Sequence, residues 1–323
     1  MMDSITYISA SSFIGAAMAM GLGAIGAALG LGYAAGRADE SMSYRPEMSG
    51  QLLKNMLIGQ AITETAAIFA LVIAIILLFA EPASTSVLAS WSAIGAGLSI
   101  GLSAIGSGVG AGLPAGAACV GMARQPDNKG KIFTTMLIGS AICQTPVIFG
   151  MVISFLLLFM DLSDIPLYPG WAAILGAGLA TGLATIGSGI GNGLTSMEAV
   201  RGIARNPDTS SDTSRVMLIG MSVGQSTAIY GFLVSLLLVF TGLEPSTTLA
   251  SSLKLIGAGL SSGFGGIGPG IGLGIVSAYA VKWVARRPEA TGTLTRTMLV
   301  GMAVTESTAI YGLIVALLLV VVF

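Results

Sequence analysis

Eight long apolar segments are the feature that most constrains how this chain can fold. They lie at about residues 9–36, 55–80, 88–119, 132–160, 168–197, 214–242, 254–283 and 297–323. Each is longer than the roughly 20 residues that an α-helix needs to cross the hydrocarbon of a bilayer. Charged residues make up only 9% of the chain and apolar residues 54%, a composition that excludes an ordinary soluble enzyme. The sequence therefore predicts an all-α membrane protein with eight transmembrane helices.

One sequence unit occurs four times along the chain. The segments NMLIGQAITETAAIF, TMLIGSAICQTPVIF, VMLIGMSVGQSTAIY and TMLVGMAVTESTAIY align without gaps, and one column of this alignment holds Glu64, Gln144, Gln225 and Glu306. We divide the chain into four helical hairpins at residues 1–82, 83–166, 167–246 and 247–323. Because each unit holds two helices, successive hairpins enter the membrane in the same direction. Such parallel hairpins favour assembly into an oligomeric ring over an alternating-access carrier.

The first helix of each hairpin is rich in glycine, as in the segment GLSAIGSGVGAG of the second hairpin. Gly106 and Gly110 are four residues apart and therefore share a helix face, as do Gly108, Gly112 and Gly116. Small residues at this spacing let membrane helices approach closely. Four copies of the pattern predict a tightly packed inner circle of helices.

The positive charges predict the orientation in the membrane. All 14 Lys and Arg residues except Lys254 lie in or beside four polar turns, one per hairpin. Short segments rich in Lys and Arg stay cytoplasmic, so we expect the turns on the cytoplasmic side and both termini on the other. We expect no cleavable signal peptide, and we expect Cys119 and Cys143 to be free thiols.

Two carboxylates are the candidates for chemistry. Glu64 and Glu306 lie about ten residues inside their helices, which is about 15 Å at the helical rise and close to the membrane midplane. An ionised carboxylate there costs at least about 2.5 kcal/mol, so it must be protonated, paired or ion-bound, and it marks an ion pathway. The alternative is a protonated glutamic acid that serves only in packing.

The residues around the two carboxylates offer oxygen atoms. Glu306 stands in the string VTESTAIY with Val304, Ser307, Thr308 and Tyr311. Hydroxyl and carbonyl oxygens suit a small hard cation such as Na⁺, and we predict a hydrogen bond from Tyr311 to the carboxylate. The pattern is weaker around Glu64, where Thr65 is the nearest hydroxyl. Ordinary hydrogen bonding between helices is the alternative role for these groups.

Together, the glycine-rich first helix, the polar turn and the mid-helix carboxylate resemble the c-subunit or proteolipid family of F- and V-type rotary ATPases, over essentially the whole chain. The turns that carry the resemblance are Arg124-Gln125-Pro126, Arg205-Asn206-Pro207 and Arg286-Arg287-Pro288, and the first hairpin departs from this pattern as Tyr44-Arg45-Pro46. The family likeness implies a non-catalytic subunit of which identical copies form a rotor ring in the bilayer. It also implies two partners, a stator a-type subunit with an essential Arg and a central stalk that contacts the turns. No cofactor and no nucleic acid are implied, and the inner membrane of a prokaryote is the expected location.

The resemblance further implies that Glu64 and Glu306 carry Na⁺ or H⁺ as the ring rotates. The sodium-binding version of the family uses a glutamine on the first helix, and the corresponding residues here are Leu31, Ala111, Asn192 and Leu273. Asn192 could take this role between adjacent hairpins, together with Ser226 and Tyr230. Gln144 and Gln225 cannot ionise, so we expect them to be degenerate sites that act as spacers.

Two other interpretations remain. A transporter or pore within one chain would be expected to show inverted repeats and a polar lumen, and the sequence shows neither. A structural proteolipid without ion traffic is favoured mildly by the two glutamines, but it does not account for Glu64 or for the string around Glu306.

Overall fold

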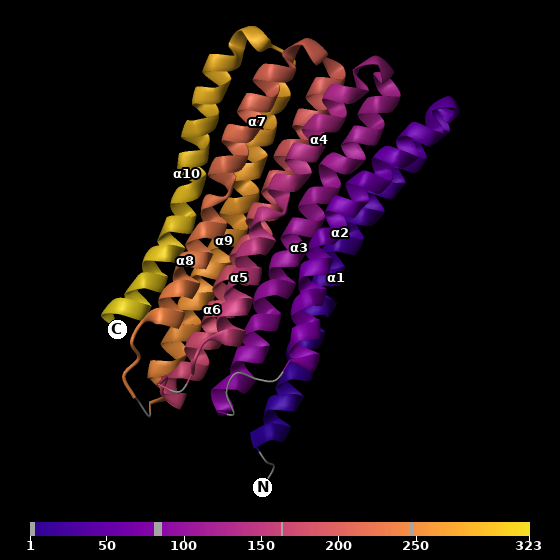
Figure 1. The fold of residues 1–323 in the computed structure, drawn as a ribbon. Helices are drawn as coiled ribbons and strands as arrows, with labels where there is room; N and C mark the ends of the chain where they lie inside the picture. Colours follow the sequence, from indigo (N-terminus) through magenta and orange to yellow (C-terminus); the bar gives the residue numbers. More distant parts are fainter. Residues whose placement is uncertain (1–3, 81–85, 163, 246–247) are drawn as a thin grey trace.

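The chain folds into eight membrane-length helices with short turns, as shown by a computed structural model that describes residues 4–80, 86–162, 164–245 and 248–323 (Figure 1). The first helices of the four hairpins are α1 (Ser4–Tyr44), α3 (Val87–Arg124), α6 (Leu167–Arg205) and α9 (Leu249–Val284). The second helices are α2 (Ser49–Phe79), the pair α4 (Lys129–Cys143) and α5 (Thr145–Phe159), the pair α7 (Ser210–Gly224) and α8 (Ser226–Phe240), and α10 (Thr291–Leu317), which continues as a π-helical segment over Leu318–Val322. The predicted all-α architecture with eight spanning helices is confirmed.

The helices form two layers. In the first, which we call the glycine layer, α1 packs on α3, α3 on α6, and α6 on α9. The second, which we call the carboxylate layer, consists of α2, α4–α5, α7–α8 and α10, each packed on the first helix of its own hairpin. The hairpin turns lie together at one end, and the beginning of α1 and the end of α10 lie at the other (Figure 1). This is the parallel arrangement of hairpins that the repeats predicted.

Glycines of the second hairpin form two contact faces rather than one. A Cβ atom at Gly106 or Gly110 would overlap the backbone of α6, whereas one at Gly108 or Gly112 would overlap the backbone of α1. Alternate glycines therefore serve the two neighbours of α3, because residues two apart point to different sides of a helix. The close packing predicted from the spacing is confirmed. In addition, α3 has glycines at its contacts with both of its neighbours, α1 and α6.

The helices of the glycine layer extend well beyond the apolar segments. Each hairpin turn is a single 3₁₀ turn that begins with proline: Pro46–Met48, Pro126–Asn128, Pro207–Thr209 and Pro288–Ala290. Many of the basic residues that mark the turns in the sequence, such as Arg37, Arg201 and Lys282, consequently lie within helix ends. An apolar run measures the membrane-embedded part of a helix, and the hydrogen-bonded backbone continues past it into a polar environment.

The second helices of the two middle hairpins are interrupted at the glutamines. The helix breaks for one residue at Gln144 and again at Gln225, whereas α2 and α10 run without a break through Glu64 and Glu306. The backbone N–H of Gln144 donates to Ala141 O at 3.1 Å. In the second hairpin, Pro146 has no N–H to donate to Ile142 O, which explains the local break.

Other sequence expectations have the following outcomes. Cys119 and Cys143 are buried free thiols, as predicted. The proposed hairpin boundaries at 82/83 and 246/247 fall outside the described residues, and the boundary at 166/167 coincides with the beginning of α6. The division into four hairpins at these residues stays a prediction.

Candidate ion-binding sites

Glu306 is held by a tyrosine from the preceding hairpin. The Tyr230 hydroxyl, on α8, donates a hydrogen bond to Glu306 Oε1, on α10, with an O···O distance of 2.6 Å. This distance lies within the normal range of O–H···O hydrogen bonds. Because one carboxylate oxygen is fixed by Tyr230, the other remains available at the interface between the third and fourth hairpins.

Tyr230 therefore takes the place that the sequence analysis assigned to Tyr311. The Tyr311 side chain is 63% exposed and Val304 is 69% exposed, both on the free side of α10. Five residues along an α-helix correspond to a rotation of about 140°, so Tyr311 points away from Glu306 on its own helix. Ser307 Oγ donates to Val304 O at 2.7 Å and Thr308 Oγ1 to Thr305 O at 3.0 Å, so neither hydroxyl reaches Glu306 in this arrangement.

Neutral polar groups of the third hairpin lie in the same region. Ser226 is half-buried on α8, one turn before Tyr230. Asn192 of α6 is 1% exposed, its Oδ1 abuts Gly224, and its Nδ2 has no hydrogen-bond partner among the described residues. A buried amide with unused hydrogen-bonding capacity requires an explanation. The unused group is an N–H donor, and the Oδ1 of the same amide lies at the third hairpin's second helix beside Gly224.

The two glutamines make the same contact with the hairpin that precedes them. Gln144 Nε2 donates to Ile62 O at 2.8 Å, and Gln225 Nε2 donates to Ile142 O at 3.3 Å. Each acceptor lies two residues before the position that aligns with the glutamine. Val223, two residues before Gln225, is the equivalent residue of the third hairpin. In the middle hairpins, the side-chain amide of the glutamine thus closes the contact with the carbonyl of the preceding hairpin.

These carbonyl acceptors were not identified from the sequence. One signal was present, because Pro146 cannot bond to Ile142 O and so leaves this carbonyl free within its own helix. Ser188 was missed as well. Its Oγ donates to Gln225 Oε1 at 3.3 Å and completes the hydrogen bonding of that side chain.

Glu64 lies at an open edge of the molecule. Its side chain is exposed on α2, and it has no hydrogen bond or ion pair within the described part of the chain. The nearby Thr65 Oγ1 donates to Ile62 O at 2.6 Å. The two carboxylates therefore differ: Tyr230 of the neighbouring third hairpin bonds to Glu306, whereas the neighbouring second hairpin bonds to Ile62 O and, among the described residues, not to Glu64.

The turn residues that were assigned to a stalk contact lie together at the opposite end from the termini (Figure 1). Arg45 is exposed and forms an ion pair with Glu47 at 3.3 Å. Asn206 Nδ2 donates to Ala285 O at 3.2 Å, which joins the third turn to the fourth hairpin. The turns therefore present an ordered polar surface at one end of the helices.

Comparison with known proteins identifies relatives of this architecture. The ATP synthase C-subunit family matches the chain four times, over residues 14–77, 94–157, 175–238 and 256–319. The K subunit of the A-type ATP synthase of Methanocaldococcus jannaschii is 34% identical over 227 residues, which cover 70% of this chain and 94% of that protein. The ATP synthase c-subunit of Petrotoga mobilis is 56% identical over 66 residues, or 20% of this chain and 69% of that protein. The ATP synthase c-subunit of Natranaerobius thermophilus is 46% identical over 82 residues, or 25% and 94%.

The repeated hairpins, the close-packed glycine layer and the carboxylates on the second helices of the first and fourth hairpins define a ring-forming membrane proteolipid. The chain belongs to the ATP synthase C-subunit family, in which it carries four fused hairpins. It is a rotor-ring subunit of an ATP synthase complex, and the interpretation as a transporter that works within one chain is therefore rejected.

Proposed function

We propose that this protein carries a monovalent cation across the membrane, one at Glu306 and one at Glu64, as the ring rotates against a stator. Na⁺ is the favoured cargo and H⁺ the alternative. The observation that carries the proposal is the bond from Tyr230 to Glu306, because it places a carboxylate between two hairpins with one oxygen fixed and one free. A carboxylate near the midplane must be neutralised, and a bound cation does this.

The oxygen donors around Glu306 favour Na⁺. Val223 O, Ser226 Oγ and Asn192 Oδ1 all come from the third hairpin, and neutral oxygens suit a hard cation. At the position where the sodium version of the family has a glutamine, the fourth hairpin has the apolar Leu273, which is fully buried. In this proposal Asn192, on the adjacent helix of the glycine layer, supplies the missing oxygen.

Glu64 acquires its site from a neighbouring copy of the chain. The free face of α10 exposes Val304 and Tyr311, and these residues occupy the same positions in their hairpin as Val223 and Tyr230 do in the third. When this face packs on the α1–α2 edge of the next copy, Tyr311 stands toward Glu64 as Tyr230 stands toward Glu306. One site is thus contained within the chain and the other forms only in the ring.

Gln144 and Gln225 act as spacers in this scheme. Their amide groups already donate to the carbonyls that face them, so these interfaces close without an ion. A ring of this protein would carry half as many ions per turn as one with a carboxylate in every hairpin. Since each charge moved is worth about 2.3 kcal/mol per 100 mV, fewer ions per ATP let the same ATP free energy work against a steeper gradient.

The partners follow from the same proposal. A stator a-type subunit with an essential Arg would accept each glutamate in its ion-free state, and the central stalk would contact the turns around Arg45, Arg124, Arg205 and Arg287. We propose that the turns face the cytoplasm of a prokaryote, because basic residues are concentrated at that end.

Carbodiimide labelling of the intact ring tests the proposal, because the reagent attacks protonated carboxyl groups within the membrane. We expect modification at Glu64 and Glu306, slowed by Na⁺ and not by K⁺. The matched control is the variant E64Q/E306Q, which should form rings but lose labelling and ion-coupled ATPase activity. Labelling that is insensitive to Na⁺ would assign H⁺ as the cargo, and coupled activity retained by the double variant would refute the proposal altogether.

A further inference from the structure

Gln60 is a polar side chain in the membrane-embedded part of α2 that the ion sites described above do not use. It stands four residues before Glu64, and residues four apart lie on the same face of a helix. This spacing corresponds to about 6 Å along the helix axis. Gln60 is half-buried and Glu64 is exposed at the open edge of the molecule. The two side chains therefore line one surface of the first hairpin.

The amide group of Gln60 is held by the first helix of its own hairpin. Its Nε2 donates to Leu31 O, on α1, at 3.1 Å. The second hairpin has the same contact, because Ser140 Oγ donates to Ala111 O at 3.1 Å. Ser140 aligns with Gln60, and Ala111 aligns with Leu31. The register of the two helices within a hairpin therefore brings this side chain to this carbonyl.

Gln60 and Ser140 differ in what they offer beyond this hydrogen bond. A hydroxyl group is sufficient to satisfy the carbonyl of the first helix, as Ser140 shows. Gln60 has in addition an amide oxygen, Oε1, which accepts no hydrogen bond within the described part of the chain. An amide oxygen that leaves water without a partner costs free energy. This oxygen therefore needs a partner once a neighbouring copy covers the open edge.

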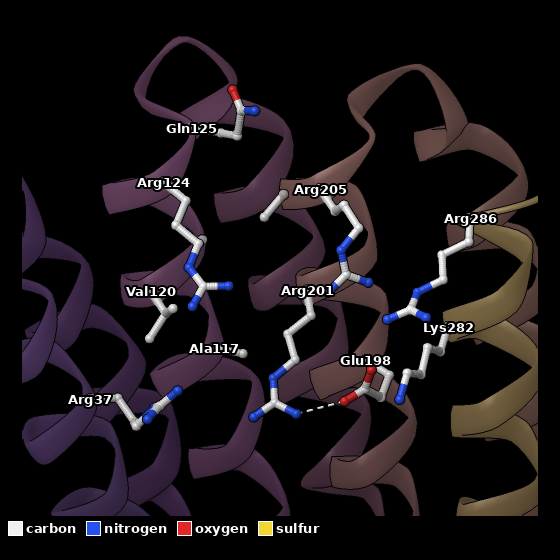
Figure 2. A pocket seen from close by; sticks show the side chains of 12 residues that line it. Arg37, Ala117, Val120, Arg124, Gln125, Glu198, Arg201, Arg205, Lys282 and Arg286 are labelled. Carbon is white, nitrogen blue, oxygen red and sulfur yellow. Dashed lines mark hydrogen bonds and ion pairs between the residues drawn. The ribbon is translucent and has the colours of Figure 1, made fainter.

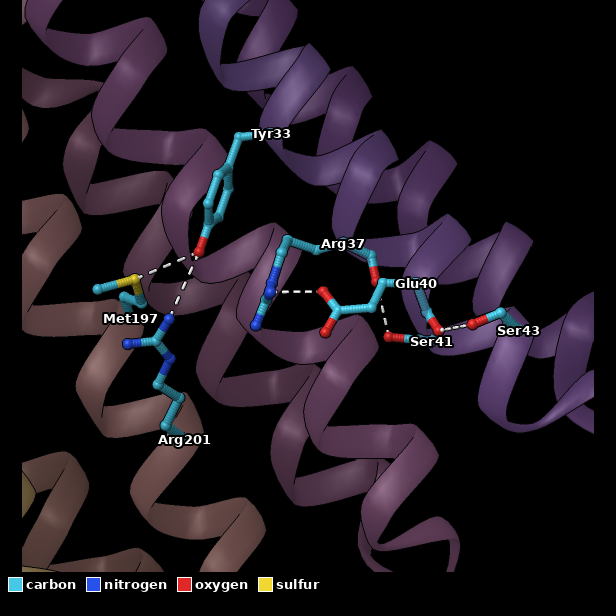
Figure 3. A network of polar contacts seen from close by, with 7 residues as sticks. All are labelled: Tyr33, Arg37, Glu40, Ser41, Ser43, Met197 and Arg201. Carbon is cyan, nitrogen blue, oxygen red and sulfur yellow. Dashed lines mark hydrogen bonds and ion pairs between the residues drawn. The ribbon is translucent and has the colours of Figure 1, made fainter.

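The basic groups at the turn end do not supply this partner. Within α1 the charged residues begin at Arg37, which follows Leu31 by six residues, or about 9 Å along the axis. Arg37 forms an ion pair with Glu40 at 2.5 Å (Figure 3). It is also one of six basic side chains from α1, α3, α6 and α9 that line a cavity of about 450 Å³ (Figure 2). The ionisable residue closest to Gln60 along α2 is Glu64.

The fourth hairpin has no amide at the matching positions. The residues that align with Gln60 and with its acceptor are Met302 and Leu273, and both are fully buried in one apolar cluster. Glu306 therefore receives no amide oxygen from its own hairpin, and Asn192 of the third hairpin lies across the interface instead. The two carboxylates thus have amide groups on opposite sides of their interfaces.

We infer that Gln60 Oε1 is an oxygen ligand of the cation carried at Glu64, and this inference rests on the function proposed above. The carboxylate and the amide oxygen are acceptors on one face of α2, and neither has a hydrogen bond within the described residues. Two such acceptors attract a cation, and a neutral amide oxygen suits a hard ion such as Na⁺. The bond to Leu31 O orients the amide before the ion arrives, so less side-chain freedom is lost on binding.

The test is the Na⁺ concentration that protects each glutamate from carbodiimide in assembled rings of the variants Q60M and Q60S. Q60M introduces the residue of the fourth hairpin and removes the whole amide group. Q60S keeps a hydroxyl group for the bond to Leu31 O, as in the second hairpin, but has no amide oxygen. In both variants we expect the protective concentration to rise at least about tenfold at Glu64 and to stay unchanged at Glu306, because an interaction with a charged group is removed at one site only.

The matched control is Q51M, because Gln51 also lies on α2 but is exposed near the turn, where Lys129 Nζ donates to it at 3.4 Å. This variant should match the parent ring at both glutamates. Unchanged protection of Glu64 in Q60M would overturn the inference. A loss in Q60M with parent affinity in Q60S would overturn it as well, because Gln60 would then serve only to join α2 to α1.

The parent ring separates this inference from the proposed function. Protection of Glu306 but not of Glu64 would overturn the role of Gln60 and leave the Na⁺ assignment at Glu306 in place. A parent ring in which neither glutamate is protected by Na⁺ would overturn the role of Gln60 together with the Na⁺ assignment.

Discussion

The sharpest prediction comes from the finding that Tyr230, and not Tyr311, bonds to Glu306. Replacing Tyr230 with Phe removes the hydroxyl that bonds to Glu306 Oε1 at 2.6 Å and keeps the aromatic side chain. A hydrogen bond to a charged group contributes about 1.5–3 kcal/mol, and each 1.4 kcal/mol is a factor of ten in affinity. Without this bond the carboxylate must be ordered by the ion itself. We therefore expect the affinity for Na⁺ at Glu306 to fall by about ten- to a hundredfold.

The assay is the Na⁺ concentration that protects each glutamate from carbodiimide labelling, read separately for Glu64 and Glu306 by peptide mass spectrometry. In Y230F the protective concentration should rise at Glu306 and stay unchanged at Glu64. The matched variant Y311F should do the reverse in the assembled ring, because Tyr311 faces a neighbouring copy. A shift at Glu306 in Y311F, or equal shifts at both glutamates in Y230F, would refute this division of the two sites.

Three further predictions concern the spacers, the packing and the open site. In Q144E an acceptor oxygen replaces the amide that donates to Ile62 O, so the new carboxylate needs a proton or cation. We expect carbodiimide to label a third position in each chain. The absence of this label would count against the role of Gln144 as a spacer. In G110A the new methyl group overlaps Gly189 of α6, so the temperature at which the ring dissociates, read on denaturing gels, should fall. The control G130A has open space around the new methyl group, and its ring should dissociate at the same temperature as the parent ring. In detergent-dispersed single chains Na⁺ should protect Glu306 but not Glu64, as mass-spectrometric labelling would show; protection of both would mean that Glu64 needs no neighbour.

The positions of the spanning helices were predictable from the sequence because a bilayer imposes a length. Any segment that crosses the hydrocarbon must be apolar over about 20 residues and must satisfy its backbone internally. The boundaries were less accurate. The helices α1 and α6 extend to Tyr44 and Arg205, beyond the apolar runs, because hydropathy measures contact with lipid and not the extent of helical hydrogen bonding.

The site was only partly predictable. The cost of a charge in the membrane singled out Glu64 and Glu306, and the internal alignment showed that Gln144 and Gln225 stand at the same position. Which tyrosine reaches Glu306 was not predictable from spacing. Tyr311 is close in sequence but on another side of α10, and Tyr230 is 76 residues away but on the facing helix.

By itself, therefore, the sequence determined the eight helices, their repetition and the two carboxylates, because each of these depends on local composition and on the cost of burying charge in lipid. The tertiary structure alone decided which groups meet. It placed Tyr230 on Glu306, directed the glutamine amides to Ile62 O and Ile142 O, and gathered basic residues from four helices around one cavity. Those contacts depend on the rotation of each helix about its axis and on its neighbour, which close packing of the glycine layer fixes.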